Sequence, residues 1–233
     1  MIRNTDFCLM TSTPFIIAID GHSSCGKSTI ARALASKLGF TYLDTGAMYR
    51  GVALYFIEHQ VNIHNHSEVK QALDKITIEF GASHDGISPL LLNGKNVEKS
   101  IRNMLVSSKV SEVAALKPVR DKLVDLQRKM SQKTSVVLDG RDIGTVVFPK
   151  AQLKLFVTAS EEIRAQRRYD ELIKKGDDIT LDEVLENLKH RDHLDSTRKE
   201  SPLKEAHDAV VLDNSKMTRE EQMDFVVALV EGK

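Results

Sequence analysis

The feature that most constrains this chain is the segment Gly21-His22-Ser23-Ser24-Cys25-Gly26-Lys27-Ser28, which follows a short apolar run. It matches the pattern G-x-x-x-x-G-K-[ST], whose glycines let the backbone curl so that its N–H groups surround phosphate oxygens. In such a loop the lysine, Lys27, reaches the β- and γ-phosphates, and the Ser28 hydroxyl binds Mg²⁺. The helix predicted over 27–38, which includes Thr29, would point its N-terminus at the same anion. The segment therefore predicts a nucleotide phosphate site.

The residues on either side support this prediction. The apolar run 15–19 is typical of a buried strand, and Ile30, Leu34 and Leu38 recur at helical spacing after the loop. At average composition, the pattern arises by chance in roughly one chain of this length in a hundred. The motif leaves the reaction open, although a GTPase would need a guanine-reading Asn-Lys-x-Asp, which the sequence lacks.

A second apolar run, Val136-Val137-Leu138, leads into Asp139. A carboxylate at the tip of that strand can hold the water shell of Mg²⁺ beside Ser28. The alternative is an acid that only begins an Asp-Gly turn. Next to a phosphate loop the sequence favours the metal role, so Ser28 and Asp139 are the expected metal-binding pair.

The alternation of apolar runs with helical patterns predicts an α/β fold of the P-loop NTPase type, a parallel sheet flanked by helices. Strands are expected at 15–19, 41–43, 136–138, 153–157 and 210–212, and helices at 27–38, 51–59, 106–116, 119–130, 160–175, 181–197 and 218–231. Residues 62–100 differ, because strand-like runs at 76–80 and 90–92 lie beside the turn residues Asp85-Gly86 and Asn93-Gly94. We expect a small antiparallel insert there.

Composition narrows the classes of partner. The 233 residues include 33 basic and 33 acidic ones, so the net charge is zero and a nucleic-acid polymer is not expected as a partner. Two cysteines make no disulfide framework, and the sequence shows neither a signal peptide nor an apolar run of roughly 18 residues. We expect a cytoplasmic monomer that does not bind membranes.

Arginines gather in two stretches that suit a small, strongly anionic ligand. On one predicted helix Arg164, Arg167 and Arg168 share a face. On the next, Arg191, Asp195 and Arg198 share a face by their i, i+4, i+7 spacing. A solvated stripe of ion pairs is the alternative for either cluster alone. Together they supply several guanidinium groups suited to bidentate phosphate recognition.

A third cluster, Asp44-Thr45-Gly46-Ala47-Met48-Tyr49-Arg50, follows the strand expected at 41–43. Thr45 stands where a helix N-cap is expected. Arg50 comes about one turn later, in a position to lean over a ligand phosphate.

These motifs together resemble those of the bacterial-type cytidylate kinases (CMP kinases), which are P-loop nucleoside monophosphate kinases. The resemblance runs from Phe15 to the last helix. It rests on the phosphate loop, the cluster 44–50, Pro118-Val119-Arg120, Leu138-Asp139-Gly140-Arg141-Asp142-Ile143-Gly144-Thr145-Val146-Val147-Phe148-Pro149 and Arg191-Asp192-His193-Leu194-Asp195-Ser196-Thr197-Arg198. The long run after Leu138 carries most weight, since a match of this length is very unlikely to arise by chance.

The resemblance implies transfer of the γ-phosphoryl group of ATP to CMP, and to dCMP, with Mg²⁺. It assigns catalysis to Lys27, Asp139, Arg141 and Arg191, and ATP binding to residues 21–29 with Arg164 and Arg168. It assigns the CMP base to Ser111, Arg120 and Asp142, the sugar to Arg191 and Asp195, and the phosphate to Arg50 and Arg198, with Thr45, Tyr49 and Arg141 also in the CMP site. It implies a kinase core over 15–61 and 101–233, an insert for nucleotide binding over 62–100, a lid over 160–178 and an N-terminal extension over 1–14.

The chemistry of cytosine agrees with this assignment. A carboxylate such as Asp142 suits the N4 amino donor, whereas the O4 of uracil would be repelled, so CMP is expected to be preferred over UMP. No general base is needed, because a phosphate monoester with a second pKa near 6 is already largely dianionic at neutral pH.

Other activities remain open at this point. A P-loop kinase for UMP, dCMP alone or a shikimate-like acceptor is the first alternative, an ATPase the second, and a non-catalytic nucleotide-binding regulator the third. The loop departs from the family pattern at His22, where proline is common, and at Cys25, where a small residue is usual. We expect alkylation of the Cys25 thiol to inactivate the protein and ATP to protect it. The alternative is an unreactive thiol that the loop shields.

Overall fold

The computed structural model describes residues 13–82 and 88–232. The chain separates into two compact units, one formed by Met1–Leu43 with Lys133–Lys233 and the other by Asp44–Gln132. The turn predicted at Asp85-Gly86 and nearly all of the extension predicted over 1–14 lie outside the described residues. The division into a core, an insert over 62–100 and a lid over 160–178 stays a prediction.

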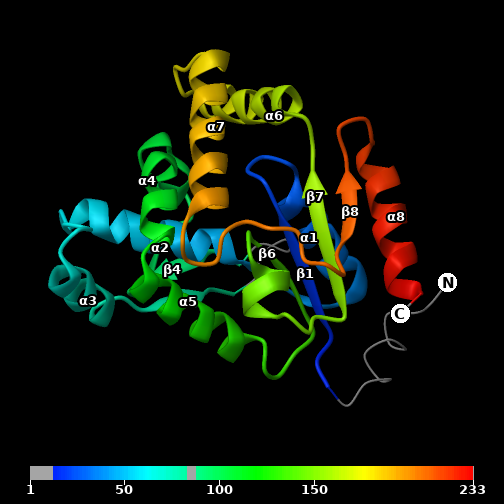
Figure 1. Ribbon diagram of the computed structural model, residues 1–233, viewed down its shortest axis with the longest axis horizontal. Helices are drawn as coiled ribbons and strands as arrows, with labels where there is room; N and C mark the ends of the chain where they lie inside the picture. The colour runs from blue at the N-terminus through cyan, green and yellow to red at the C-terminus, as the bar shows by residue number, and fades with distance from the viewer. Residues whose placement is uncertain (1–12, 83–87, 233) are drawn as a thin grey trace. The chain divides into compact units, whose positions relative to one another are not determined.

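The first unit is built on a five-stranded sheet with the strand order β2-β6-β1-β7-β8. The strands are β1 (Ile16–Gly21), β2 (Thr41–Asp44), β6 (Val136–Asp139), β7 (Leu153–Thr158) and β8 (Val210–Asp213). The central strand β1 pairs in parallel with β6 and β7, and β7 pairs in parallel with β8 (Figure 1). The predicted α/β class, a parallel sheet flanked by helices, is confirmed.

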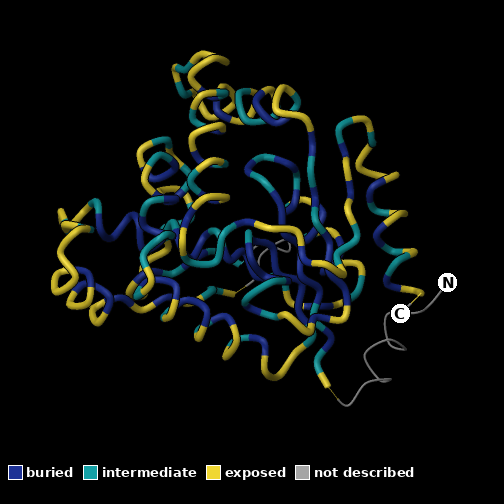
Figure 2. The backbone as a smooth tube through the Cα atoms, in the orientation of Figure 1, coloured by how far each residue is buried: buried dark blue, intermediate teal, exposed yellow. Residues whose placement is uncertain are grey.

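Alternate residues of β1 explain how one face of this sheet is covered. Ile17 and Ile19 are fully buried in a core that they share with Leu34 of α1 (Lys27–Leu38) and Val226 of α8 (Arg219–Glu231). Figure 2 shows the strand as an almost unbroken buried segment. Burial on both faces accounts for the continuous apolar run in the sequence.

Two further helices of the first unit begin at side-chain caps. In α6 (Glu161–Lys175) the Ser160 hydroxyl accepts a hydrogen bond from Ile163 N, and α7 (Leu181–Thr197) begins with a reciprocal capping box between Thr180 and Glu183. Such caps satisfy N–H groups that have no partner within the helix. The two helices pack against each other.

The second unit combines helices with a small antiparallel sheet, as the sequence predicted for part of this region. Its elements are α2 (Thr45–Glu58), α3 (His66–Asp74), β3 (Ile78–Phe80), β4 (Leu90–Leu92), β5 (Lys95–Asn96), the 3-10 helix η1 (Ser100–Arg102), α4 (Met104–Ala114) and α5 (Lys117–Met130). Strand β4 pairs antiparallel with both β3 and β5. The expected start of a helix at residue 51 is wrong, because α2 begins at Thr45.

The second unit has its own apolar core. Met48 and Val52 of α2 pack there with Leu90 of β4, Val106 of α4 and Leu123 of α5, all of them buried.

Across residues 13–82 and 88–232, no helix is both long and apolar enough to cross a membrane.

Candidate functional site

The phosphate-loop motif lies between β1 and α1, where the sequence placed it. Gly21 ends β1 with φ 145°, and a Cβ atom at this position would lie 2.0 Å from the carbonyl oxygen of Val157 on β7. No side chain fits so close to a neighbouring backbone, which accounts for the first glycine of the motif. The loop then leads to Lys27, the first residue of α1.

Lys27 is buried inside this loop. Its Nζ donates to the His22 carbonyl oxygen at 2.5 Å and lies 3.5 Å from Cys25 Sγ. Burial, and then the positive charge of Arg141, hold the pKa of Lys27 below its ordinary value. The Cys25 thiol is fully buried and donates to the His22 carbonyl oxygen at 3.1 Å, which favours the shielded alternative for this cysteine.

The two residues of the predicted metal-binding pair are joined by a hydrogen bond. Ser28 Oγ donates to Asp139 Oδ2 at 2.7 Å, which brings the first turn of α1 to the end of β6. The other carboxylate oxygen of Asp139 accepts a hydrogen bond from the Tyr42 hydroxyl at 2.8 Å. Sequence reasoning did not identify Tyr42, whose side chain comes from the neighbouring strand β2 and carries no motif of its own.

Arg141 connects the phosphate loop to α7. One guanidinium nitrogen donates to Ser23 Oγ at 2.7 Å, and Nε donates to Asp195 Oδ2 at 2.9 Å. Burial alone would raise the pKa of Asp195, but the charges of Arg141, Arg191 and Arg198 together hold that pKa below its ordinary value. Asp195 is therefore an anion surrounded by cations.

The charges on and after α7 are buried, which argues against the alternative of a solvated stripe. Arg191 and Asp195 are buried, and Arg198 is buried as well, 3.7 Å from Asp142 and 3.8 Å from Asp195. The expectation that all three lie on one helix face is wrong for Arg198, because α7 ends at Thr197 and Arg198 is its C-cap residue, with φ −58° and ψ 142°. Buried charges are costly unless they are paired, so this cluster indicates a function for the charges rather than solvation.

The arginines of α6 take different positions. Arg164 is buried, donating to the Ser23 carbonyl oxygen at 3.2 Å and to Asp192 Oδ2 at 2.5 Å. Arg168 instead forms an ion pair with Glu171 on the same helix at 2.9 Å. Of the two arginines assigned to ATP, Arg164 contacts the loop through the Ser23 carbonyl oxygen.

Asp192 and Asn214 are supporting residues that sequence reasoning missed. Asp192 pairs with Arg164 and accepts a hydrogen bond from Ser23 N at 3.4 Å. Burial opposes its ionisation, but hydrogen bonds from His22 and Arg164 keep the pKa of Asp192 well below its usual range. Asn214 follows β8 and donates to the Cys25 carbonyl oxygen at 2.8 Å. Its only signal was its place at the end of a strand that runs parallel to β1.

The second unit holds the other residues assigned to CMP. These are Thr45, Tyr49, Arg50, Ser111 and Arg120, of which all but Arg50 are buried. The Arg120 guanidinium lies over the Tyr49 ring, 5.3 Å from its centroid, which is the geometry of a cation–π contact. The predicted N-cap at Thr45 is wrong, because the Asp44 carboxylate caps α2 by accepting from Ala47 N at 2.8 Å.

Asp44 is also held by cations of its own unit. Arg102 donates to Asp44 Oδ2 at 2.7 Å and to Glu98. Burial would raise the pKa of Asp44, but the charges of Arg102 and Arg50 outweigh burial and lower that pKa. Arg102 is a further residue that the motifs did not reveal, since it lies far from Asp44 along the chain.

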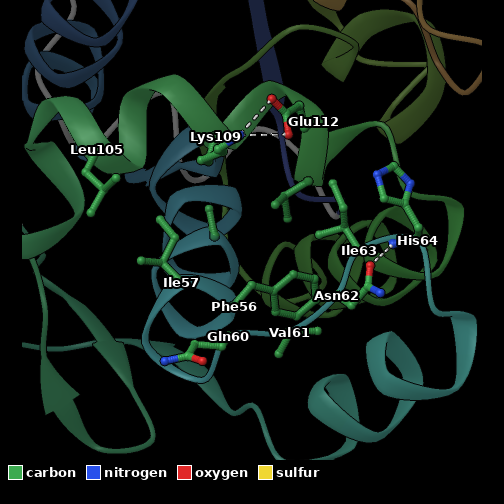
Figure 3. Close-up of a pocket in the computed structure, with 12 residues that line it drawn as sticks. Phe56, Ile57, Gln60, Val61, Asn62, Ile63, His64, Leu105, Lys109 and Glu112 are labelled. Atoms are coloured by element: carbon green, nitrogen blue, oxygen red, sulfur yellow. Dashed lines mark hydrogen bonds and ion pairs between the residues drawn. The ribbon is translucent and has the colours of Figure 1, made fainter.

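A pocket of about 510 Å³ in the second unit is separate from all of these residues. It lies between α2 and α4, where Phe56 and Ile57 face Leu105, Lys109 and Glu112 (Figure 3). None of the residues that line it was assigned individually to ATP, CMP or the metal, although residues 62–64 belong to the insert predicted over 62–100.

Comparisons with known proteins identify the family. A family model described as cytidylate kinase matches residues 17–232. A cytidylate kinase of Parabacteroides distasonis is 56% identical over 216 residues, which cover 91% of this chain and 94% of that protein. A cytidylate kinase of Cytophaga hutchinsonii is 51% identical over 219 residues, 94% of each chain. The structure of an uncharacterized protein from Eubacterium ventriosum aligns with 94% of this chain and 99% of its own at a TM-score of 0.53 and 12% identity, which is a likeness of fold alone. The matches confirm the family that the motifs predicted: this chain belongs to the cytidylate kinase family.

Proposed function

We propose that this protein transfers the γ-phosphoryl group of ATP to CMP, giving CDP and ADP. The observation that carries the proposal is the linked arrangement of the phosphate loop, the Ser28–Asp139 pair and the buried cluster of Arg141, Asp195 and Arg198. Membership of the cytidylate kinase family supports the choice of acceptor. We extend the proposal to dCMP as a second acceptor.

The donor side of the reaction belongs to the loop 21–29. Lys27 supplies a cation for the β- and γ-phosphates, and the start of α1 supplies N–H groups and a favourable helix dipole. Arg164 and Arg168 are assigned to ATP as well. The buried Arg164 contact with Ser23 O supports that role for the first of them.

The residues present fit a magnesium ion bound with ATP. Ser28 and Asp139 offer a hydroxyl and a carboxylate 2.7 Å apart, and hard oxygen ligands are those that Mg²⁺ prefers. Bound there, the ion would neutralise charge on the phosphate oxygens during transfer. Tyr42 holds one oxygen of Asp139, which fixes the direction of the carboxylate.

Arginines supply the remaining charge stabilisation. Phosphoryl transfer depends mainly on positioning and on cations near the transferring oxygens, because the protein has little covalent chemistry to perform. Arg141 and Arg191 are proposed for this role, and Arg50 and Arg198 for holding the acceptor phosphate. The acceptor attacks as a phosphate dianion, so no side chain has to remove a proton.

Recognition of the base is assigned to Asp142, Ser111 and Arg120. A carboxylate accepts a hydrogen bond from the N4 amino group of cytosine, and hydroxyl and guanidinium donors suit its N3 and O2 acceptors. Thr45 and Tyr49 are placed with the CMP-binding residues, and Asp195 with the sugar. The cytoplasmic location and the monomeric state expected from the sequence stay predictions.

The proposal is tested by a coupled assay of ADP release with Mg²⁺–ATP. CMP, dCMP, UMP, AMP, GMP and buffer alone are compared as acceptors. Turnover with CMP and dCMP, little with UMP and almost none in buffer is the expected result. Turnover in buffer alone would make the protein an ATPase, and turnover with another acceptor only would overturn the assignment of CMP.

A further inference from the structure

Asp20 is a buried carboxylate that the donor and acceptor assignments leave without a role. It is the residue before Gly21 on the central strand β1, and only 4% of it is exposed. Its Oδ1 accepts from Ile143 N at 2.8 Å, and its Oδ2 accepts from Gly144 N at 2.7 Å. One carboxylate therefore binds two consecutive backbone N–H groups of a distant segment.

That segment is the π-helical turn η2 (Ile143–Val147), which follows Arg141 and Asp142 directly. The carbonyl oxygen of Asp142 accepts from Val146 N and Val147 N, so the turn closes on Asp142 itself. The N–H groups at the start of a helical turn have no partner within it. Asp20 on strand β1 accepts hydrogen bonds from these N–H groups, as an N-cap side chain does at the start of its own helix.

We propose that Asp20 is a positioning residue for phosphoryl transfer, holding η2 so that Arg141 keeps its contact with the phosphate loop and Asp142 keeps its place near Arg198. The proposal rests on the function proposed above, in which these two residues act on the substrates. Asp20 itself is not among the residues assigned to either substrate. The carboxylate is suited to this task because charge-assisted hydrogen bonds to backbone N–H groups are stronger than neutral ones.

The protonation state of Asp20 gives a readout of this role. Burial, opposed in part by the two backbone hydrogen bonds, raises the pKa of Asp20 to about 7. The charged groups that act on it are Asp142, which favours the protonated form, and Lys27, which favours the carboxylate. The ionised form of Asp20, which binds both N–H groups more strongly than the protonated form, is therefore present above about pH 7 and is lost as the pH falls below it.

The test compares wild type with Asp20→Asn, which keeps the shape of the side chain but turns an amide N–H₂ toward one of the backbone N–H groups. We expect KM for CMP to rise roughly 10-fold or more, in line with the loss of one charge-assisted hydrogen bond, and KM for ATP to change less. Wild type should lose kcat/KM for CMP below about pH 7. Asp20→Asn should lack that decline and keep only the one near pH 6 that belongs to the substrate phosphate.

Two further variants separate positioning from general damage. Asp125→Asn removes an exposed carboxylate that pairs with Lys129 on α5, in the other unit, and should leave both KM values unchanged. Gly144→Ala disturbs the same contact from the other side, because its Cβ would lie 3.3 Å from Asp20 Oδ2 and 3.1 Å from Lys154 Cδ. It should reproduce the rise in KM for CMP even if Asp20→Asn does not fold.

The outcomes are distinct for the two proposals. If wild type does not use CMP, the proposed function fails and the positioning role fails with it. If wild type uses CMP but Asp20→Asn and Gly144→Ala match Asp125→Asn in both KM values and in the pH profile, the positioning role alone is overturned. Equal rises in KM for CMP and ATP, with an unchanged pH profile, would also overturn it.

Discussion

Gly21→Ala gives the most direct test of how the sheet and the phosphate loop are joined. The added Cβ would lie 2.0 Å from Val157 O, whereas ordinary contacts of such atoms begin at 3.4 Å. The Gly21–Val157 pair at the end of the β1–β7 ladder must therefore open by roughly 1.4 Å. In addition, φ 145° is a backbone conformation that an alanine rarely adopts.

The expected loss of stability is the sum of these two effects. A side chain forced into close-packed surroundings costs about 1–3 kcal/mol, and a strained backbone conformation costs about the same. Together they give about 4 kcal/mol. For a chain of this length each kcal/mol lowers Tm by about 2–4 °C, so Gly21→Ala should lower Tm by about 8–16 °C. It should also raise KM for ATP, because the loop begins at this residue.

Gly39→Ala is the matched control. Gly39 ends α1 with φ 68°, but a Cβ there would meet nothing within 4 Å. Only the backbone strain remains, about 1–2 kcal/mol, with no effect on KM for ATP. Thermal unfolding followed by circular dichroism, together with ADP-release kinetics, measures both. A difference of less than about 1 kcal/mol between the two variants would refute the argument from the Val157 contact.

Two predictions concern the charges of the site. Asp142→Asn should lower the preference for CMP over UMP by about tenfold, or about 1.4 kcal/mol, because the amide can donate to the uracil O4. An unchanged ratio of kcat/KM for CMP to kcat/KM for UMP would contradict base recognition by Asp142. Asp195→Asn leaves Arg141, Arg191 and Arg198 without their shared anion and should lower the free energy of unfolding at pH 7 by about 3 kcal/mol. Because the pKa of Asp195 is lowered in the folded protein, this stability is present above about pH 4 and is lost as the pH falls. Urea unfolding should therefore show that the difference in free energy of unfolding between variant and wild type closes below that pH.

Much of the first unit could be predicted because its elements carry strong local patterns. Helix α1 has apolar residues at helical spacing and a glycine at its end, and its bounds agree with the prediction.

In the second unit, helix α3 was missed because its first turn, from His66 to Glu68, is exposed and polar. Strand β5 was missed because Lys95 and Asn96 are both exposed and have no apolar neighbour in the strand.

The site could be predicted only where a motif carries it. Ser28 and Asp139 were paired in advance because each ends or begins an element at the same edge of the sheet. Tyr42, Asp192 and Asp20 were not assigned, because each acts through a partner that is remote in sequence and has no characteristic spacing. Arg198 shows the converse limit, because its spacing suggested a helix face although α7 ends one residue before it, at Thr197.

The two hydrogen bonds of Arg141 have a thermodynamic consequence. One guanidinium holds both Ser23 of the phosphate loop and Asp195 of α7, so a ligand that moves either partner changes the environment of the other. Any coupling free energy of this kind acts reciprocally. If ATP tightens the binding of CMP by a given factor, CMP must tighten the binding of ATP by the same factor. Arg141→Met should bring both factors toward one.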